Sequence, residues 1–237
     1  MIRSQHARDL IAELGAEFIA FDNKIFGESY PSGNKTECLT AIPNDNTFLF
    51  FDSDTLILDE LCNVPFDFSR PTASLRRTAT WPQPLGPGHH YADIWKDCYD
   101  ICGVDYTSSL DEQFFAQDWR RYLYFNASFF FYENPTKFGA RFLEFAQRIK
   151  NSTRPRITRQ SLDPWLDQVV LPMVIHSFGG EDTHLLMDGW TQRLAVIMVG
   201  YPFFTLERMI GSSLNWNNLQ TKPTSAHICG STRLFNG

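Results

Sequence analysis

The segment 47–57, which reads Thr-Phe-Leu-Phe-Phe-Asp-Ser-Asp-Thr-Leu-Ile, constrains the fold more than any other part of the chain. A run of β-forming apolar residues ends at two carboxylates, Asp52 and Asp54, and apolar residues resume at once. We therefore predict a buried strand that carries Asp-x-Asp to its C-terminal end, which is the edge where open α/β sheets bind ligands. Carboxylates this close repel each other unless a cation neutralises them, so the motif indicates a Mg²⁺ or Mn²⁺ site. A turn that the two Asp side chains merely cap is the alternative.

The order of the elements around this strand predicts the fold class. The residue patterns predict a helix over 4–14, a strand over 17–21 and a helix over 31–42, followed by the Asp-x-Asp strand. A β-α-β order is typical of a parallel sheet with helices on its faces. We therefore predict a Rossmann-like α/β fold with a mixed, mostly parallel sheet flanked by helices.

The rest of the chain predicts alternating loops, helices and strands. Residues 63–90 are rich in Pro and Gly and form a loop-rich excursion, with an extended piece over 73–81. The other predicted elements are a helix over 91–101, a β segment over 122–132, a helix from Pro135 with Asn134 as its N-cap, a helix that starts near Ser161, and a short strand over 225–228.

The composition narrows the classes of function. The net charge is −6 and no basic stretch could follow a phosphate backbone, so nucleic acid is not an expected partner. The 21 Phe residues imply a heavily aromatic core or a surface that suits sugars. An odd, scattered set of cysteines favours reduced core thiols over a disulfide or metal site, and Cys98 and Cys102 are expected on one helix face.

Neither a targeting signal nor a transmembrane segment is predicted. The N-terminus lacks the apolar core of a secretory signal. The longest apolar run, 194–204, is interrupted by Gly200 and Pro202 and falls short of the ~20 residues that a spanning helix needs. The expectation is a cytoplasmic protein, so the N-x-Ser/Thr triplets are read as chance matches. The sequence leaves the oligomeric state open.

Four short motifs follow one another along the chain. They are Phe51–Asp54 (Phe-Asp-Ser-Asp), Phe125–Ser128 (Phe-Asn-Ala-Ser), Asp167-Gln168 and the tail His227–Phe235 (His-Ile-Cys-Gly-Ser-Thr-Arg-Leu-Phe). In this order they resemble the motifs of the GT-A glycosyltransferases, especially the retaining family that includes glycogenin and the bacterial lipopolysaccharide galactosyltransferases. That family has Asp-x-Asp, Phe-Asn-Ala-Gly, Asp-Gln and a His-x-x-Gly-x-x-Lys-Pro-Trp tail. The resemblance covers about residues 16–235 and implies one GT-A-like domain over residues 1–237.

The resemblance implies a metal-dependent hexosyl transfer. Asp52, Asp54 and His227 correspond to the metal ligands of the family, and a set that includes an imidazole suits Mn²⁺ better than Mg²⁺. The expected donor is a nucleotide sugar, in particular a UDP-sugar, whose departing diphosphate a cation would stabilise. The expected acceptor is a glycan, a lipid or a protein. A core His that pairs with a backbone carbonyl is the alternative for His227.

The resemblance also implies the catalytic pair. Asp167 is expected to contact donor-sugar hydroxyls, and Gln168 is expected on the β face of the sugar. The expected substrate-binding residues are Lys35, Asn126, Gly230 and Arg233, of which Arg233 replaces the family Lys and can hold the diphosphate by paired hydrogen bonds. The alternatives are solvated helix residues for Asp167, Gln168 and Lys35, and a strand-end or bulge residue for Asn126. His89 and His90 are candidates for an acceptor groove with Trp81 and Tyr91.

Besides Arg233, the chain departs from the family pattern in three places. Fewer residues precede Asp52 than the analogy requires, so the opening strand is expected to be missing. Either the chain is then an N-terminally truncated domain, or it builds the nucleotide-base pocket differently. Ser128 replaces a glycine of the family, and Leu234-Phe235 replaces Pro-Trp.

Two other functions are compatible with Asp-x-Asp after an apolar strand. Haloacid-dehalogenase phosphatases use the first Asp as nucleophile and the second as general acid, but they have Asp-x-Asp-Gly-Thr near the N-terminus. Here the motif is Asp-Ser-Asp-Thr-Leu and lies farther along the chain. The second alternative is a non-catalytic remnant of a GT-A domain that binds a partner or a glycan. Retention and inversion also stay open, and an inverting enzyme would need Asp167 or Asp111 as general base.

Overall fold

The computed structural model describes residues 4–180 with short gaps, together with 195–197. The gaps are residues 18, 43–45, 53–54, 58–60, 62–63, 65, 75–78, 84–85 and 87–89. The predicted strand over 225–228 therefore lies outside the described residues.

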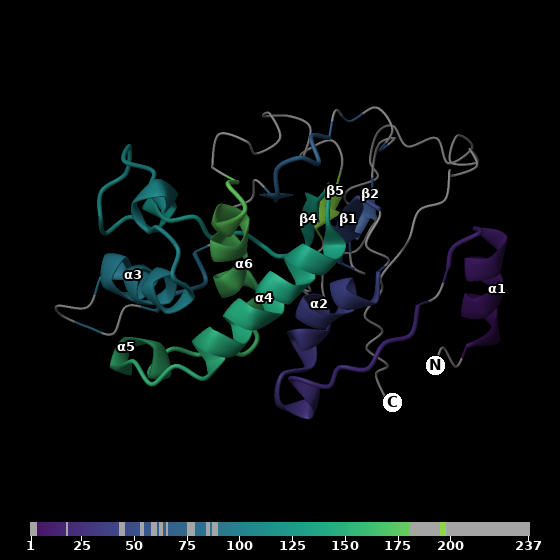
Figure 1. Cartoon of the computed structure of the whole chain (residues 1–237), viewed down its shortest axis with the longest axis horizontal. Helices are drawn as coiled ribbons and strands as arrows, with labels where there is room; N and C mark the ends of the chain where they lie inside the picture. Colours follow the sequence, from purple (N-terminus) through teal and green to yellow (C-terminus); the bar gives the residue numbers. More distant parts are fainter. Residues whose placement is uncertain are drawn as a thin grey trace, which may run out of the picture.

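Helices and short antiparallel strands make up the described part (Figure 1). The α-helices are α1 (Gln5–Glu13), α2 (Asn34–Glu37), α3 (Tyr91–Cys102), α4 (Pro135–Lys150), α5 (Pro155–Thr158) and α6 (Leu166–Ser177). The 3₁₀ turns are η1 (Gly27–Ser29), η2 (Pro31–Gly33), η3 (Cys38–Ala41), η5 (Thr107–Ser109) and η6 (Trp119–Arg121). The strands are β1 (Phe48–Phe51), β2 (Thr55–Ile57), β3 (Thr72–Ala73), β4 (Phe129–Tyr132) and β5 (Ala195–Ile197).

β4 is the central strand of the larger sheet, whose order is β1-β4-β3. It runs antiparallel to β1, with Phe51 opposite Phe129, and antiparallel to β3. β2 and β5 form a second antiparallel pair. The mixed helix-and-sheet class is therefore confirmed, but the strand pairs in the described part are antiparallel, whereas the predicted sheet is mostly parallel.

One source of this difference is the predicted strand over 17–21, which does not form in its described residues. The prediction relied on local β propensity, and a strand also needs a neighbour to accept its backbone hydrogen bonds. A little farther along, the backbone N–H groups of Lys24, Ile25 and Phe26 donate to the Glu37 carboxylate at 2.9–3.3 Å. The backbone N–H groups of residues 24–26 are thus satisfied by a side chain and not by a neighbouring strand.

Most of the other predicted elements are confirmed, because local signals specify them. Ser4 caps α1, and Asn134 caps α4 by accepting a 2.8 Å hydrogen bond from the Lys137 N–H. The helical turns from η2 through η3 cover the helix predicted over 31–42. The β-prone stretch 122–132 forms a strand only in its last part, β4. Cys98 and Cys102 are buried, free thiols on α3, as predicted.

Aromatic rings dominate the core between β1, β4 and α4. Phe130 of β4 stacks on Phe50 of β1 with ring centroids 4.5 Å apart, and on Phe138 of α4 at 5.5 Å. Gly139 permits close approach of α4 to η3, because a Cβ there would lie 2.8 Å from the Leu39 Cβ. The high Phe content therefore does build an aromatic core.

Trp81 belongs to this core at 2% exposure, so its predicted place in an acceptor groove is wrong.

α6 lies beside α4 and is apolar on nearly every side (Figure 1). Its buried residues include Val169, Val170 and Met173, which are 0% exposed. A helix that is hydrophobic all round is a core helix. Among the buried residues of α6, the polar exception is Asp167 in its first turn.

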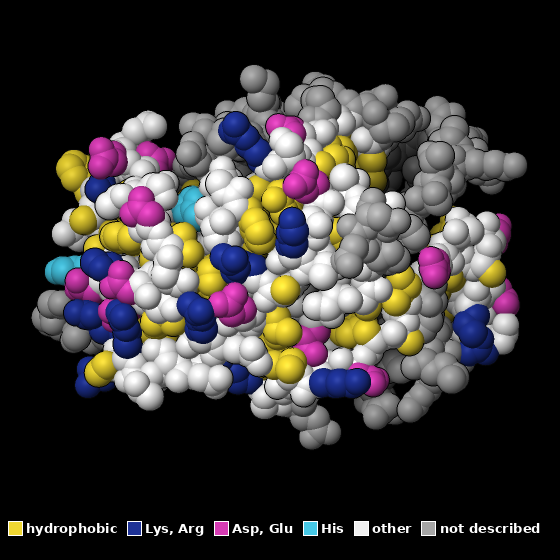
Figure 2. Space-filling model, viewed as in Figure 1, with side chains coloured by type: hydrophobic (Ala, Val, Ile, Leu, Met, Phe, Trp, Pro, Cys, Tyr) yellow, Lys and Arg dark blue, Asp and Glu magenta, His cyan; other side chains and the backbone are white. Residues whose placement is uncertain are grey.

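An ion-pair clamp joins α3 to α5. The buried Asp97 carboxylate accepts hydrogen bonds from Arg154 at 2.8 Å and Arg156 at 2.9 Å. Figure 2 shows acidic and basic side chains intermingled over this part of the surface. Among the described helices, none combines the length and the apolar character needed to cross a bilayer.

The aromatic core leads to a first prediction. Phe142→Ala removes a ring that is 0% exposed and should lower the free energy of unfolding by about 3–5 kcal/mol. Phe115→Ala is the matched control, because that ring is 85% exposed and its loss should change stability by no more than about 0.5 kcal/mol. Urea denaturation followed by circular dichroism measures both. Equal losses in the two variants would contradict the described core.

Candidate functional site

Four side chains from separate segments meet at the C-terminal end of β1. Asp52 directly follows β1, Lys35 lies in α2, Asp167 lies in the first turn of α6, and Tyr30 precedes η2. The Lys35 ammonium lies 2.5 Å from Asp52 Oδ2 and 3.3 Å from Asp167 Oδ2. The Tyr30 hydroxyl lies 3.1 Å from Asp167 Oδ1. We call these four residues the Lys35 cluster.

Local structure holds Lys35 in place. Its helix α2 is continuous with η2 and η3, and the Thr36 hydroxyl donates to the Gly33 carbonyl at 2.7 Å. The neighbouring Glu37 is 5% exposed and ties residues 24–26 to α2 through their backbone N–H groups. These bonds anchor the segment that leads to Tyr30. Lys35 and Tyr30 are therefore held in place by the same hydrogen-bonded segment.

Tyr30 orients Asp167 from two directions. Its hydroxyl accepts a 3.1 Å hydrogen bond from the Asp167 backbone N–H. The hydroxyl proton can be donated to Asp167 Oδ1 or to the Pro164 carbonyl, both at 3.1 Å. The positive end of the α6 dipole further favours a carboxylate at this position. The Asp167 carboxylate is thus held at both oxygens, by Tyr30 on one and Lys35 on the other.

Burial and charge pairing act together in this cluster. One ammonium faces two carboxylates, and the side chains of Lys35, Asp52 and Asp167 are only 15%, 19% and 2% exposed. Burial alone would lower the pKa of Lys35, but Asp167 and Asp52 outweigh it and raise that pKa. Burial raises the pKa of the Asp167 carboxyl, and Lys35 offsets this in part. Burial, together with Asp167, raises the pKa of the Tyr30 hydroxyl.

The second sequence motif, Phe125–Ser128, lies beside Asp52. The Asp52 N–H donates to the Ser128 carbonyl at 2.9 Å, which extends the β1–β4 ladder by one bond. The hydroxyls of Ser128 and Thr55 are buried and have no hydrogen-bond partner among the described residues. Unpaired hydroxyls in such a place cost free energy unless something satisfies them. Thr55 lies three residues after Asp52 along the chain, and Ser128 lies opposite Asp52 across the ladder.

The structure thus brings together Lys35, Asp52 and Asp167, which the sequence singles out independently. Asn126 is half-buried and lies two residues before Ser128, and Gln168 is half-buried beside Asp167. Asp54, His227, Gly230 and Arg233 lie outside the described residues. Within the described residues, no three His, Cys, Asp or Glu side chains are grouped as metal ligands would be.

The sequence analysis missed two residues of this site. Tyr30 contacts Asp167, which is remote in the sequence, and Glu37 contacts backbone groups of an irregular segment. Tyr30 directly precedes Pro31 and the first helical turn, but no spacing rule links it to Asp167, 137 residues away. Only tertiary structure identifies this pair.

A comparison with protein families assigns the chain to a known family. The chain matches the model of the Rhodobacterales glycosyltransferase domain over residues 1–179, so it belongs to this family. The Lys35 cluster and both Asn126 and Gln168 lie in the matched range, whereas His227 and Arg233 follow it. Comparisons with curated proteins and with solved structures found no match. The glycosyltransferase class predicted from the motifs is therefore confirmed at the level of the family.

The buried charges lead to a second prediction. Lys35→Met leaves two carboxylates facing each other and should lower the free energy of unfolding at pH 8 by about 3–5 kcal/mol. Lys96→Met removes an exposed ion pair with Asp100 and should cost no more than about 1 kcal/mol. Urea denaturation measures both. Similar small losses would show that the Lys35 contacts do not stabilise the fold.

The comparison of the Lys35 protein with Lys35→Met also predicts how the free energy of unfolding depends on pH. Because the folded-state pKa of Lys35 is raised above 10.5, its contribution is complete below pH 10.5 and is lost as the pH rises through the folded pKa. The raised pKa of the Tyr30 hydroxyl also makes the stability fall at high pH. Both proteins should therefore carry Tyr30→Phe, so that the difference between them reports Lys35 alone. As the pH rises from 10.5 to 11.5, the stability of the Lys35 protein should then fall more steeply than that of Lys35→Met. Parallel curves would contradict the shift.

Proposed function

We propose that this glycosyltransferase domain transfers a hexose from a nucleotide sugar, in particular a UDP-sugar, to a glycan, lipid or protein acceptor with the help of Mn²⁺ or Mg²⁺. We further propose a GT-A-like fold over residues 1–237, similar to that of glycogenin and the lipopolysaccharide galactosyltransferases. The observation that supports this most is the convergence of Asp52, Lys35 and Asp167 within the range that matches the family.

A divalent cation fits the part of the site that is described. Two carboxylates converge there, and the Asp52 side chain retains 19% exposure, so a cation could reach it from solvent. Asp52 would share the cation with Asp54 and His227 in the proposal. When bound, the cation would stabilise the negative charge of the leaving diphosphate.

The protein groups around the cation have distinct proposed tasks. Lys35 is a cation on a helix held by hydrogen bonds. Its ammonium would donate hydrogen bonds to phosphate oxygens after its ion pair with Asp52 is broken. Asp167 would accept hydrogen bonds from donor-sugar hydroxyls, with Tyr30 restricting its rotation. The amides of Asn126 and Gln168 would face the sugar. Gly230 and Arg233 would contact the diphosphate, where a guanidinium can form paired hydrogen bonds.

The position of Asp167 suits hydroxyl recognition better than proton abstraction. Its carboxylate is 2% exposed and both oxygens already have partners, so little freedom remains for a bound water. A carboxylate held in one orientation discriminates between sugar epimers, because a misplaced hydroxyl leaves it unpaired. We therefore expect Asp167 to contribute to donor selection as well as to rate.

The third prediction concerns donor binding. Isothermal titration of UDP should show binding that weakens at least about 10-fold when EDTA replaces Mn²⁺, and Asp54→Ala should abolish the metal effect. Asp22→Asn is the matched control for loss of a carboxylate, because Asp22 is 81% exposed, and it should bind UDP as the wild type does. Metal-independent binding, or no binding, would contradict the proposal and favour a non-catalytic remnant.

The fourth prediction separates binding from chemistry. Asp167→Asn should retain metal-dependent UDP binding but slow the hydrolysis of the preferred UDP-sugar by about 10²-fold or more, because the amide cannot replace a charged acceptor. A screen of UDP-glucose, UDP-galactose and their N-acetyl derivatives identifies that donor. Unchanged hydrolysis in Asp167→Asn would remove this residue from the site. Hydrolysis of p-nitrophenyl phosphate that depends on Asp52 would instead indicate a phosphatase.

A further inference from the structure

The Lys35 ammonium contacts the same carboxylate that the proposed cation would use. Its Nζ lies 2.5 Å from Asp52 Oδ2, and a small divalent cation binds oxygen at ~2 Å. A cation on that oxygen would therefore lie within about 5 Å of the ammonium. The two positive charges would repel each other strongly, because the side chains of Lys35 and Asp52 are only 15% and 19% exposed.

Lys35 cannot relieve this repulsion by losing its proton at neutral pH. Burial lowers the pKa of Lys35, but Asp167 and Asp52 outweigh burial and raise that pKa. The ammonium therefore stays charged. A cation that binds at Asp52 must either tolerate the ammonium or displace it from the carboxylate.

The position of Asp167 allows the ammonium to be displaced over a short distance. Lys35 Nζ also lies 3.3 Å from Asp167 Oδ2, so the ammonium can leave Asp52 and keep one partner. Asp167 itself is held in place, because its side chain is 2% exposed and the Tyr30 hydroxyl lies 3.1 Å from its other oxygen. The flexible four-carbon stem of a lysine permits this change while α2 stays where it is. The displaced ammonium then needs a new anionic partner in place of Asp52.

A diphosphate is an anionic partner that fits this place. Phosphate oxygens accept hydrogen bonds from ammonium groups, and they also bind divalent cations. A diphosphate could therefore take the ammonium from Asp52 and share the cation with Asp52. We infer that Lys35 makes cation binding depend on the diphosphate, because the ammonium opposes the cation until a phosphate oxygen replaces Asp52 as its partner. This inference rests on the proposed function and adds a form of regulation to the same site.

The alternative is a permanent ion pair that only stabilises the fold. In that case UDP would raise the affinity for Mn²⁺ by the same factor with and without Lys35, because the nucleotide would not change the contacts of the ammonium. In the inferred arrangement, UDP removes a repulsion that is present only when Lys35 is present. The coupling between Mn²⁺ and UDP is therefore the decisive quantity, and it is the same whichever of the two ligands binds first.

The test measures Mn²⁺ affinity by electron paramagnetic resonance of the free ion, on the whole chain, with and without saturating UDP. Without nucleotide, Lys35→Met should bind Mn²⁺ at least about 10-fold more tightly than the wild type, because the repulsion is gone. UDP should increase the Mn²⁺ affinity of the wild type by a factor at least about 10-fold larger than the factor for Lys35→Met.

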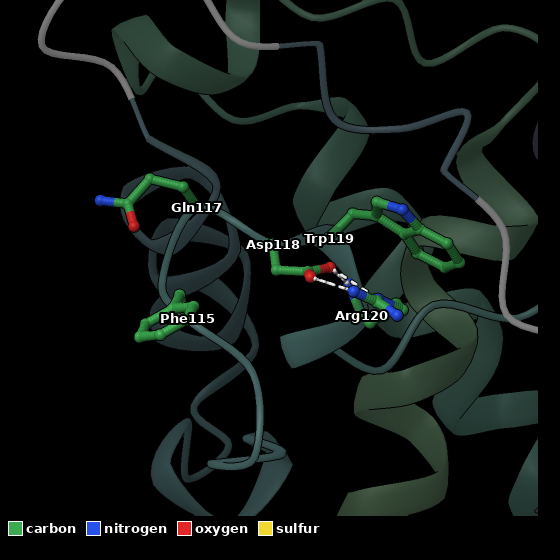
Figure 3. A pocket seen from close by; sticks show the side chains of 5 residues that line it. All are labelled: Phe115, Gln117, Asp118, Trp119 and Arg120. Carbon is green, nitrogen blue, oxygen red and sulfur yellow. Dashed lines mark hydrogen bonds and ion pairs between the residues drawn. The ribbon is translucent and has the colours of Figure 1, made fainter.

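Arg120→Met is the matched control for a carboxylate that loses its cationic partner. Figure 3 shows the ion pair of Arg120 with Asp118 in a hollow of the loop between α3 and β4. The Asp118 side chain is 22% exposed, close to the 19% of Asp52. Because Asp118 does not belong to the Lys35 cluster, Arg120→Met should bind Mn²⁺ as the wild type does, with and without UDP.

A second pair of proteins repeats the test with less risk of unfolding. Lys35→Met leaves Asp52 and Asp167 facing each other, whereas Asp167→Asn removes one of these charges and its amide oxygen can still accept from Tyr30. Without nucleotide, Lys35→Met combined with Asp167→Asn should bind Mn²⁺ at least about 10-fold more tightly than Asp167→Asn alone. Circular dichroism verifies that each protein is folded.

Three results would overturn the inference. They are equal Mn²⁺ affinities with and without Lys35, an equal effect of UDP in the two proteins, and a gain in Mn²⁺ affinity in Arg120→Met as large as that in Lys35→Met. Failure of the proposed function has a different signature, since the wild type would then form no complex with Mn²⁺ and UDP together. If the wild type forms that complex and removal of Lys35 changes neither quantity, the inference fails alone.

Discussion

The site depends on one charged interaction, in which the Lys35 ammonium lies between the Asp52 and Asp167 carboxylates. These residues belong to α2, the end of β1 and the first turn of α6. Because the three groups are largely buried, none of their charges is tolerable without the others. The contact therefore constrains the relative positions of these segments. The proposed cation and donor sugar would bind beside this contact.

The aromatic core supports this charged cluster mechanically. Phe50 lies two residues before Asp52 and stacks on Phe130, which lies two residues after Ser128, so the end of β1 has little freedom to move. On the other side, α6 is buried along its length and cannot rotate Asp167 outward without exposing its apolar residues. Packing forces thus supply the rigidity that a charged site needs, because the charges themselves favour hydration.

The predictable features are those with local causes. Asn134 and Pro135 specify the start of α4 because a cap and a preset φ act within one turn. The apolar run before Asp52 specifies β1 for a similar reason, and the family match confirms the glycosyltransferase class that the motifs predicted. The direction of strand pairing has no such local cause, since it depends on how the long connection between β1 and β4 folds back. Glu37, which ties an irregular segment to α2, likewise acts through contacts that no periodicity signals.

The sequence by itself determined the chemical inventory: an acidic pair after an apolar strand, a second carboxylate near a helix start, a lysine in a short helix and an abundance of Phe. It also determined most helices and the glycosyltransferase family to which residues 1–179 belong. Only the tertiary structure decided that Lys35 pairs with both Asp52 and Asp167, that Tyr30 orients Asp167, and that Phe115 faces solvent while Trp81 does not. The physical reason is that burial and charge pairing are properties of surroundings, and residues far apart in the chain supply those surroundings.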